Sequence, residues 1–286
     1  MPIVRSVSQL RDAVRRWRRK SRKIALVPTM GGLHEGHLSL VRIARKNADR
    51  VIVSSFVNPT QFGPDEDFDN YPRDEHGDNR LLAKAGTDLV YAPSILEMYP
   101  GDFATRVEVA ELTQCLCGVS RPHFFAGVTT VVTKLFLQSL PDIAVFGEKD
   151  YQQLLVIRQL VKDLNFPIEI LSGPIVRESD GLAMSSRNAY LSEEDRATAP
   201  QLYNILSDMA ADLSVGRDVE STISMGVNRL RGAGFRIDYL DVRTEDTLIP
   251  LEGRVVDPAR IFAAVHLGNT RLIDNVPIEV IEDPVV

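Results

Sequence analysis

The chain has 286 residues, of which 44% are hydrophobic and 25% charged, a composition typical of globular proteins and not of disordered or fibrous ones. Its 33 basic and 39 acidic residues give a net charge of −6, which disfavours nucleic acid and anionic membranes as partners. Two cysteines, Cys115 and Cys117, are too few for a disulfide framework or a four-ligand zinc site and indicate a reducing, cytoplasmic setting. No apolar stretch approaches the ~20 residues of a membrane span, and residues 1–23 lack the apolar region of a signal peptide.

The first segment of the chain is rich in basic residues. Its apolar residues recur at i, i+3, i+4 and i+7, which predicts an amphipathic helix; they are Leu10, Ala13, Val14 and Trp17. On this interpretation the arginines and lysines form the solvated face of the helix. A transit peptide or a nucleic-acid-binding arm is the alternative interpretation of the same charges.

From residue 24 to about residue 170 the chain alternates β-rich runs with helical patterns. The β-rich runs cover 24–29, 51–57, 88–93, 143–147 and 168–171, and the clearest helical patterns cover 37–45 and 151–164. Strands separated by helices predict βαβ units, and therefore a Rossmann-like parallel sheet with helices on both faces. Ligands of such sheets bind beyond the carboxyl ends of the strands, so the loops at those ends are the places to look for function.

The pattern changes after residue 175. Two helical stretches, near 194–213 and 217–232, are followed by β-rich runs at 236–243, 260–268 and 270–277. We therefore predict an α/β protein with a Rossmann-like domain over residues 1–175 and a smaller C-terminal α+β domain over residues 176–286. The boundary falls close to Gly173-Pro174.

The sequence PTMGGLHEGH, residues 28–37, lies between a predicted strand and a predicted helix. His34 and His37 are three residues apart, which places both on one face of a first helical turn. Glycines at 31, 32 and 36 let the backbone approach a ligand closely, and a helix N-terminus favours anions, so the motif predicts a phosphate site. The spacing matches neither the dinucleotide motif nor the P-loop. A glycine turn with two surface histidines, or a zinc site, remains as an alternative, although no third metal ligand is near in sequence.

Three further segments carry polar groups in predicted loops. FGEKDYQQL, residues 146–154, again joins a β-rich run to a helix, so Lys149 can reach phosphate while Asp150 and Gln153 lie on the first turn. MSSR, residues 184–187, offers two hydroxyls and a guanidinium, which are donors suited to an anion. In FVNPTQF, residues 56–62, the amides of Asn58 and Gln61 suit an uncharged, hydroxyl-bearing molecule. In isolation each segment could also be an ordinary solvated loop or turn.

Taken together, these segments resemble a known family. His34-Glu35-Gly36-His37 after a strand resembles the HxGH signature of the nucleotidylyltransferase superfamily, and PTMGGLHEGH is similar to the pantothenate synthetase (pantoate-β-alanine ligase) family within it. FVNPTQF, YPRD (71–74), FGEKDYQQL and DGLAMSSRNAYL (180–191) match that family in the same order over about 160 residues. One departure is that Arg121-Pro122-His123-Phe124-Phe125 has its histidine one place earlier than the family pattern, so His123 is left out of the predicted site.

The resemblance implies an ATP-dependent ligase that condenses pantoate with β-alanine to pantothenate through a pantoyl adenylate and releases AMP and pyrophosphate. It implies ATP as a substrate, Mg²⁺, a homodimer and a cytoplasmic location. No convincing activated nucleophile is present in the sequence, so catalysis is expected to work by positioning and charge stabilisation. A nucleotidylyltransferase that moves AMP or CMP onto a phosphorylated acceptor is the alternative.

The same resemblance implies which residues form the site. The catalytic residues are His34, His37, Lys149 and Arg187, with His37 as the candidate proton donor. The ATP contacts are Met30, Gly31, Gly32, Leu33, His34, Glu35, Gly36, His37, Gly147, Glu148, Lys149, Asp150, Val176, Met184, Ser185, Ser186 and Arg187. Pantoate is assigned to Asn58, Gln61 and Gln153, and β-alanine to Gln61. The metal ligand stays open between Asp78 and Asp150.

Overall fold

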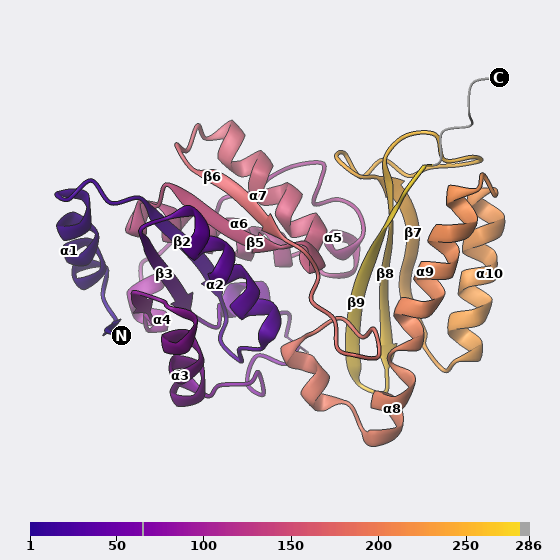
Figure 1. Ribbon diagram of the computed structural model, residues 1–286, viewed down its shortest axis with the longest axis horizontal. Helices are drawn as coiled ribbons and strands as arrows, with labels where there is room; N and C mark the ends of the chain where they lie inside the picture. Colours follow the sequence, from indigo (N-terminus) through magenta and orange to yellow (C-terminus); the bar gives the residue numbers. More distant parts are fainter. Residues whose placement is uncertain (65, 281–286) are drawn as a thin grey trace. The chain divides into compact units, whose positions relative to one another are not determined.

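The computed structural model describes residues 1–64 and 66–280, which form two compact units (Figure 1). The first unit comprises Met1–Gln114, Arg121–Glu148 and Gln152–Val176. The second comprises Cys115–Ser120, Lys149–Tyr151 and the chain from Arg177 onward. Two short segments of the second unit are therefore inserted in the sequence of the first, a feature that the sequence patterns do not indicate.

The first unit contains a parallel six-stranded sheet. The strand order is β1-β4-β3-β2-β5-β6, with β1 (Ile3–Val4), β2 (Ile24–Thr29), β3 (Arg50–Ser55), β4 (Leu89–Tyr91), β5 (Ile143–Gly147) and β6 (Glu169–Gly173). The central strand β2 pairs with both β3 and β5, and its residues 24–27 are completely buried. Continuous burial explains why this strand is an uninterrupted apolar run, as parallel strands covered on both faces are. The predicted Rossmann-like sheet is confirmed.

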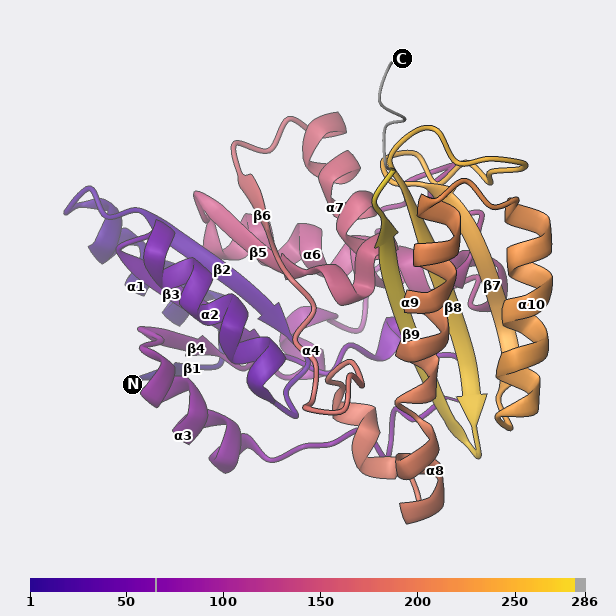
Figure 2. The same ribbon diagram turned by 45° about the vertical axis from the view of Figure 1, so that its right-hand side comes forward.

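Helices cover both faces of this sheet. On one face α2 (Glu35–Asn47) and α3 (Glu75–Ala85) share a core with alternate residues of β2, β3 and β5 (Figure 2). On the other face lie α1 (Val7–Arg18) and α6 (Phe124–Ser139), which contact each other. Helix α7 (Tyr151–Asp163) connects β5 to β6. A right-handed crossover places it on the α6 face.

Helix α1 has the amphipathic character that its spacing predicts. Leu10, Ala13 and Val14 are buried, and Ser6 with Gln9 forms a capping box at its N-terminus. Arg18 on its basic face donates to both carboxylate oxygens of Asp142 at 2.8 Å. The basic face thus takes part in the fold of the first unit.

The second unit contains an antiparallel three-stranded sheet in the order β7-β8-β9. Its strands are β7 (Arg236–Thr244), β8 (Ala259–Leu267) and β9 (Thr270–Ile278), and one face is covered by α9 (Gln201–Ser214) and α10 (Val219–Gly232) (Figure 1). The predicted smaller α+β domain is confirmed. The helical stretch predicted near 194–213 consists of two helices, because α8 (Glu193–Thr198) ends before Pro200 and α9 begins after it. Proline lacks the N–H that a continuous helix needs and clashes with the preceding turn.

The remaining elements are short. They are η1 (Pro59–Gln61), α4 (Ile95–Met98), α5 (Cys117–Ser120), η2 (Glu148–Asp150) and η3 (Ser186–Tyr190). Among the residues described, no helix has both the length and the apolar character needed to cross a bilayer.

Candidate active site

The HxGH motif forms the start of α2, directly beyond the carboxyl end of the central strand β2. His34 is the N-cap residue and His37 is at position N3, and their rings lie 4.1 Å apart between centroids. The preceding Gly31 and Gly32 both have positive φ, +83° and +62°, which only glycine adopts without strain. The sequence therefore folds into a tight turn that brings both imidazoles to one helix N-terminus.

The ring nitrogens of these histidines have distinct roles. Nδ1 of His34 accepts the N–H of Gly36 at 3.2 Å, and Nδ1 of His37 accepts the N–H of His34 at 3.4 Å. A nitrogen that accepts a hydrogen bond carries no proton, so in each neutral ring the proton belongs to Nε2. Both imidazoles can therefore act as Nε2–H donors without being charged, which suits the oxygens of a phosphate group.

Asp78 supports the backbone of the same turn. This residue of α3 is 6% exposed, and its two carboxylate oxygens accept the N–H groups of Gly32 at 2.9 Å and Leu33 at 2.8 Å. Burial raises the pKa of this carboxyl, and the two backbone N–H groups lower it in part. Asp78 thus fixes the glycine turn, a role that the sequence analysis did not assign to it.

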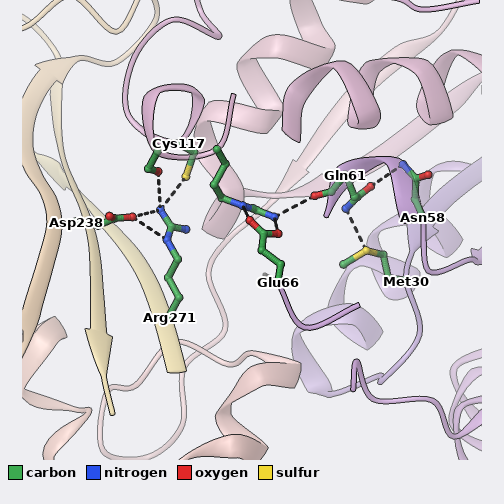
Figure 3. A network of polar contacts seen from close by, with 9 residues as sticks. Met30, Asn58, Gln61, Glu66, Cys117, Asp238 and Arg271 are labelled. Carbon is green, nitrogen blue, oxygen red and sulfur yellow. Dashed lines mark hydrogen bonds and ion pairs between the residues drawn. The ribbon is translucent and has the colours of Figure 1, made fainter. Parts of the chain in front are cut away.

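The amides predicted to contact pantoate lie in the η1 turn after β3. Asn58 is 1% exposed, and its Nδ2 donates to Oε1 of Gln61 and to the carbonyl of Gly127, both at 3.1 Å (Figure 3). Nε2 of Gln61 donates to the sulfur of Met30 at 3.1 Å. The side-chain amide of Gln61 therefore contacts Met30, which directly follows β2, and is oriented by Asn58.

Tyr99 is a member of this network that sequence reasoning missed. Its hydroxyl donates to Oδ1 of Asn58 at 2.9 Å, so both ends of the Asn58 amide are engaged within the first unit. Burial raises the pKa of Tyr99, which keeps the hydroxyl protonated as a donor. No motif surrounds Tyr99, and the turn that it supports is 41 residues earlier in the sequence.

Arg121 holds the segment that follows Gln61. Its Nε donates to Glu66 at 2.6 Å, and a terminal nitrogen donates to the Gln61 carbonyl at 3.1 Å. Its guanidinium carbon lies 4.0 Å from the centroid of the Phe124 ring. A carboxylate of the protein thus already pairs with this guanidinium. His123 lies exposed at the start of α6, where its side chain makes no capping bond.

Further predicted site residues lie at the end of β5 and in the segments that follow it. Gly147 ends β5, and Oε1 of Glu148 accepts a bond from the Ser172 hydroxyl at 2.7 Å. Lys149 and Asp150 belong to the second unit, where the carbonyl of Lys149 accepts from Asn275 at 3.0 Å. Gln153 lies half-buried in the first turn of α7, and Val176 is the last residue of the first unit.

The MSSR segment belongs to the second unit. The hydroxyl of Ser185 caps η3 by accepting the N–H of Arg187 at 3.3 Å. Nδ2 of Asn188 donates to the Ala183 carbonyl at 3.1 Å and to Glu178 at 3.2 Å, which closes the loop at its base. Met184, Ser185, Ser186 and Arg187 are all half-buried. The backbone of the loop is therefore fixed by hydrogen bonds of Ser185 and Asn188 within the second unit.

The described residues contain no cluster of three or more His, Cys, Asp or Glu side chains able to hold a metal ion. The zinc alternative for His34 and His37 therefore gains no third ligand from residues 1–64 and 66–280.

Known proteins resemble this chain over nearly its whole length. The model of the pantoate-beta-alanine ligase family matches residues 2–277. A curated pantothenate synthetase of Rhodospirillum rubrum is 54% identical over 277 residues, which cover 96% of this chain and 98% of that protein. The crystal structure of pantothenate synthetase from Thermus thermophilus superposes with a TM-score of 0.92 at 48% identity, covering 97% of this chain and 99% of that chain.

A further solved structure was determined with ligands. Pantoate-beta-alanine ligase from Francisella tularensis, complexed with beta-gamma ATP and beta-alanine, superposes with a TM-score of 0.83 at 36% identity, over 98% of both chains. The family model covers residues 2–277, and the relative from Rhodospirillum rubrum aligns with 96% of this chain. This chain belongs to the pantoate-beta-alanine ligase family.

Proposed function

We propose that this chain catalyses the ATP-dependent condensation of pantoate with β-alanine through a pantoyl adenylate, using the residues singled out above. The family match supports the overall reaction, and the Francisella protein, which was solved with an ATP compound and β-alanine, supports both as substrates. The observation that carries the assignment of residues is the pair of imidazoles at the N-terminus of α2, each with its Nδ1 accepting a backbone N–H.

In the first step, an oxygen of the pantoate carboxylate attacks the α-phosphorus of ATP and pyrophosphate leaves. Negative charge shifts onto the phosphate oxygens and the departing pyrophosphate. The Nε2–H groups of His34 and His37 donate to these oxygens, and Lys149 and Arg187 add positive charge. His37 is the residue that we assign to proton donation toward the leaving group.

In the second step, the amine of β-alanine attacks the acyl carbon of the pantoyl adenylate. The bond between that carbon and the phosphate oxygen breaks, so pantothenate and AMP are released and the amine loses a proton. Gln61 and Gln153 orient the pantoyl group through their amides, with Gln61 also beside β-alanine. Asn58 contributes by holding the amide of Gln61.

ATP contacts the glycine turn of residues 30–37, the β5 loop of residues 147–150, Val176 and the loop of residues 184–187. Mg²⁺ would accompany ATP in this proposal and would supply positive charge to the triphosphate. Asp78 already accepts two backbone N–H groups, so we assign the assisting carboxylate to Asp150.

We extend the proposal to the setting of the enzyme. The family resemblance implies a homodimer formed through the first unit and a cytoplasmic location. Size-exclusion chromatography with light scattering tests the dimer directly, since a single species of 31.8 kDa would contradict it.

The experiment that tests the function is product analysis with purified protein, ATP and Mg²⁺. Pantoate alone, β-alanine alone and both together are compared, and AMP, pyrophosphate and pantothenate are measured. Sustained AMP and pantothenate production only with both substrates is the expected result. A stable nucleotidylated acceptor without amide formation would instead support the nucleotidylyltransferase alternative, which the family match does not favour.

A further inference from the structure

Two adjacent residues of β9, Asp274 and Asn275, are buried and polar in a sheet whose core is otherwise largely apolar. Asp274 is 4% exposed and Asn275 is 2% exposed. Buried polar side chains are costly unless they are fully hydrogen-bonded, so the identity of their partners is informative. Successive side chains of a strand point to opposite faces of the sheet, and the two residues therefore contact different segments.

Asn275 contacts the segment that carries Lys149. Its Nδ2 donates to the carbonyl oxygen of Lys149 at 3.0 Å, and its Oδ1 accepts from Arg260 at 2.6 Å. The Arg260 guanidinium also lies over the ring of Tyr151, 4.0 Å from its centroid. The backbone of residues 149–151 is therefore held on one face of the second unit's sheet by an amide and a guanidinium.

Asp274 contacts the start of the segment that carries Ser185 and Arg187. Its carboxylate pairs with both terminal nitrogens of Arg177 at 2.6 and 2.9 Å, and Arg177 donates onward to the carbonyl of Gly181 at 3.1 Å. The ring of Tyr203 lies 3.7 Å from the same guanidinium. Gly181 has φ +95°, and a Cβ there would lie 2.7 Å from the Tyr203 ring, so the turn is closely fitted to α9.

We propose that Asp274 and Asn275 are positioning residues. Asn275 fixes the backbone of Lys149, and Asp274 fixes the loop of residues 184–187 through Arg177. A single strand, β9, therefore positions both segments of the second unit that carry groups directed at phosphate. The catalytic half of this proposal rests on the proposed function of Lys149 and Arg187. The structural half does not, because it concerns only contacts within the second unit.

Hydrogen exchange tests the structural half with a crossed pair of variants. Asn275→Asp keeps the acceptor for Arg260 but replaces the donor to Lys149 by a carboxylate oxygen, so amide exchange is expected to rise at least tenfold around residues 149–152 and not around 181–188. Asp274→Asn keeps the shape but loses the charge paired with Arg177, so the opposite pattern is expected. If Asp274→Asn does not fold, Arg177→Lys serves instead, because it keeps a charge for Asp274 but has no fork to reach Gly181 as well. Equal exchange increases throughout the sheet, or none, would overturn the proposal.

Kinetics test the catalytic half in the full-length enzyme. Asn275→Asp is expected to lower kcat for pantoate-dependent pyrophosphate release by about tenfold to a hundredfold, the scale of a misplaced catalytic group, while KM for pantoate stays unchanged. On a Lys149→Ala background the same change is expected to have no further effect. Independent, multiplicative losses would overturn the assignment, whereas full activity of Lys149→Ala alone would instead remove the proposed role of Lys149.

Asp238→Asn is the matched control. Asp238 is a β7 residue whose carboxylate pairs with Arg271 of β9 at 2.9 Å in the same sheet (Figure 3), and the same guanidinium donates to Cys117 and Ser120. Loss of this ion pair is expected to lower thermal stability without changing kcat, KM or the exchange of residues 149–152 and 181–188. A kinetic loss in Asp238→Asn as large as that in Asn275→Asp would show that general destabilisation explains both.

Discussion

At the scale of single residues, the two histidines of the glycine turn define what the site can do. Because each Nδ1 accepts a backbone N–H, each ring carries its proton on Nε2 in its neutral form. We expect His37→Ala to lower the rate of adenylate formation by ~10²–10³, the scale of losing one oxyanion donor. His76→Ala, which removes an exposed histidine of α3, is expected to leave the rate unchanged. Near-normal pyrophosphate release by His37→Ala would refute the assigned role.

Asp78 makes a prediction about stability and pH. In Asp78→Asn a single oxygen replaces two acceptors, so one of the N–H groups of Gly32 and Leu33 loses its partner, at a cost of ~1–3 kcal/mol. Burial raises the pKa of the native carboxyl, so the folded state binds its proton more tightly than the unfolded state does. Protonated Asp78 therefore stabilises the folded state fully at a pH below the pKa that its carboxyl has in the unfolded chain. This stabilisation is lost as the pH rises through the pKa that the carboxyl has in the folded state.

The measurement is urea unfolding of both proteins at about pH 4, close to the ordinary carboxyl pKa, and at about pH 8. The advantage of the native protein over Asp78→Asn is expected to be larger at the lower pH. An advantage that grew as the pH rose would mean that the carboxylate is stabilised, and not penalised, by its surroundings.

At the scale of elements, the close packing of α6 on the η1 turn sets the position of Gln61. A Cβ at Gly127 would lie 2.4 Å from the carbonyl oxygen of Thr60 and 2.7 Å from the backbone nitrogen of Gln61. Gly127→Ala is therefore expected to displace the turn, with a stability loss of ~1–3 kcal/mol from overpacking and a rise in KM for pantoate of about tenfold. Steady-state kinetics and thermal unfolding measure both effects.

Gly232→Ala is the control for that substitution. Gly232 ends α10, and a Cβ at that position would have no heavy atom within 4 Å among its non-local neighbours. Its replacement is expected to leave KM unchanged and to raise stability slightly, as alanine does in helices. A KM for pantoate that is unaffected in Gly127→Ala would show that the α6 contact does not position Gln61.

Some helices and strands of this fold can be predicted from the sequence, and others cannot. Buried strands such as β2 and β5 and amphipathic helices such as α1 carry a periodicity that predicts them. Helix α6 escaped prediction because it is buried almost all round, with apolar residues on every side and no polar stripe. Helix α3 escaped it for the opposite reason, since only Asp78 and Leu82 in it are buried.

At the scale of the whole molecule, charge separates the ligase from a nucleic-acid-binding protein. The net charge is −6, and Arg15 and Arg18 of the basic helix are paired with Asp12 and Asp142. We expect fluorescence anisotropy to detect no binding of a labelled oligonucleotide at about 0.15 M salt. Micromolar binding that weakens steeply as the salt concentration rises would support the alternative that the first helix binds nucleic acid.

The predicted site residues came from contiguous motifs, whereas their supports did not. His34, Lys149 and Arg187 each belong to a short segment with recognisable spacing. Tyr99 and Asn275 are isolated in the sequence and reach their partners across 41 and 126 residues. The contacts of these two residues depend on tertiary packing, so no local sequence pattern predicts them. The step from a phosphate site to pantoate and β-alanine likewise came from the family resemblance and not from residue chemistry.

The central claim is that a pantoyl adenylate forms before the amine reacts. The most direct measurement is rapid-quench mixing of the enzyme with ATP, Mg²⁺ and pantoate in the absence of β-alanine. The account predicts a burst of about one pyrophosphate per active site, and later addition of β-alanine should yield AMP and pantothenate in equal amounts. Pyrophosphate that appears only after β-alanine is added would contradict the adenylate mechanism.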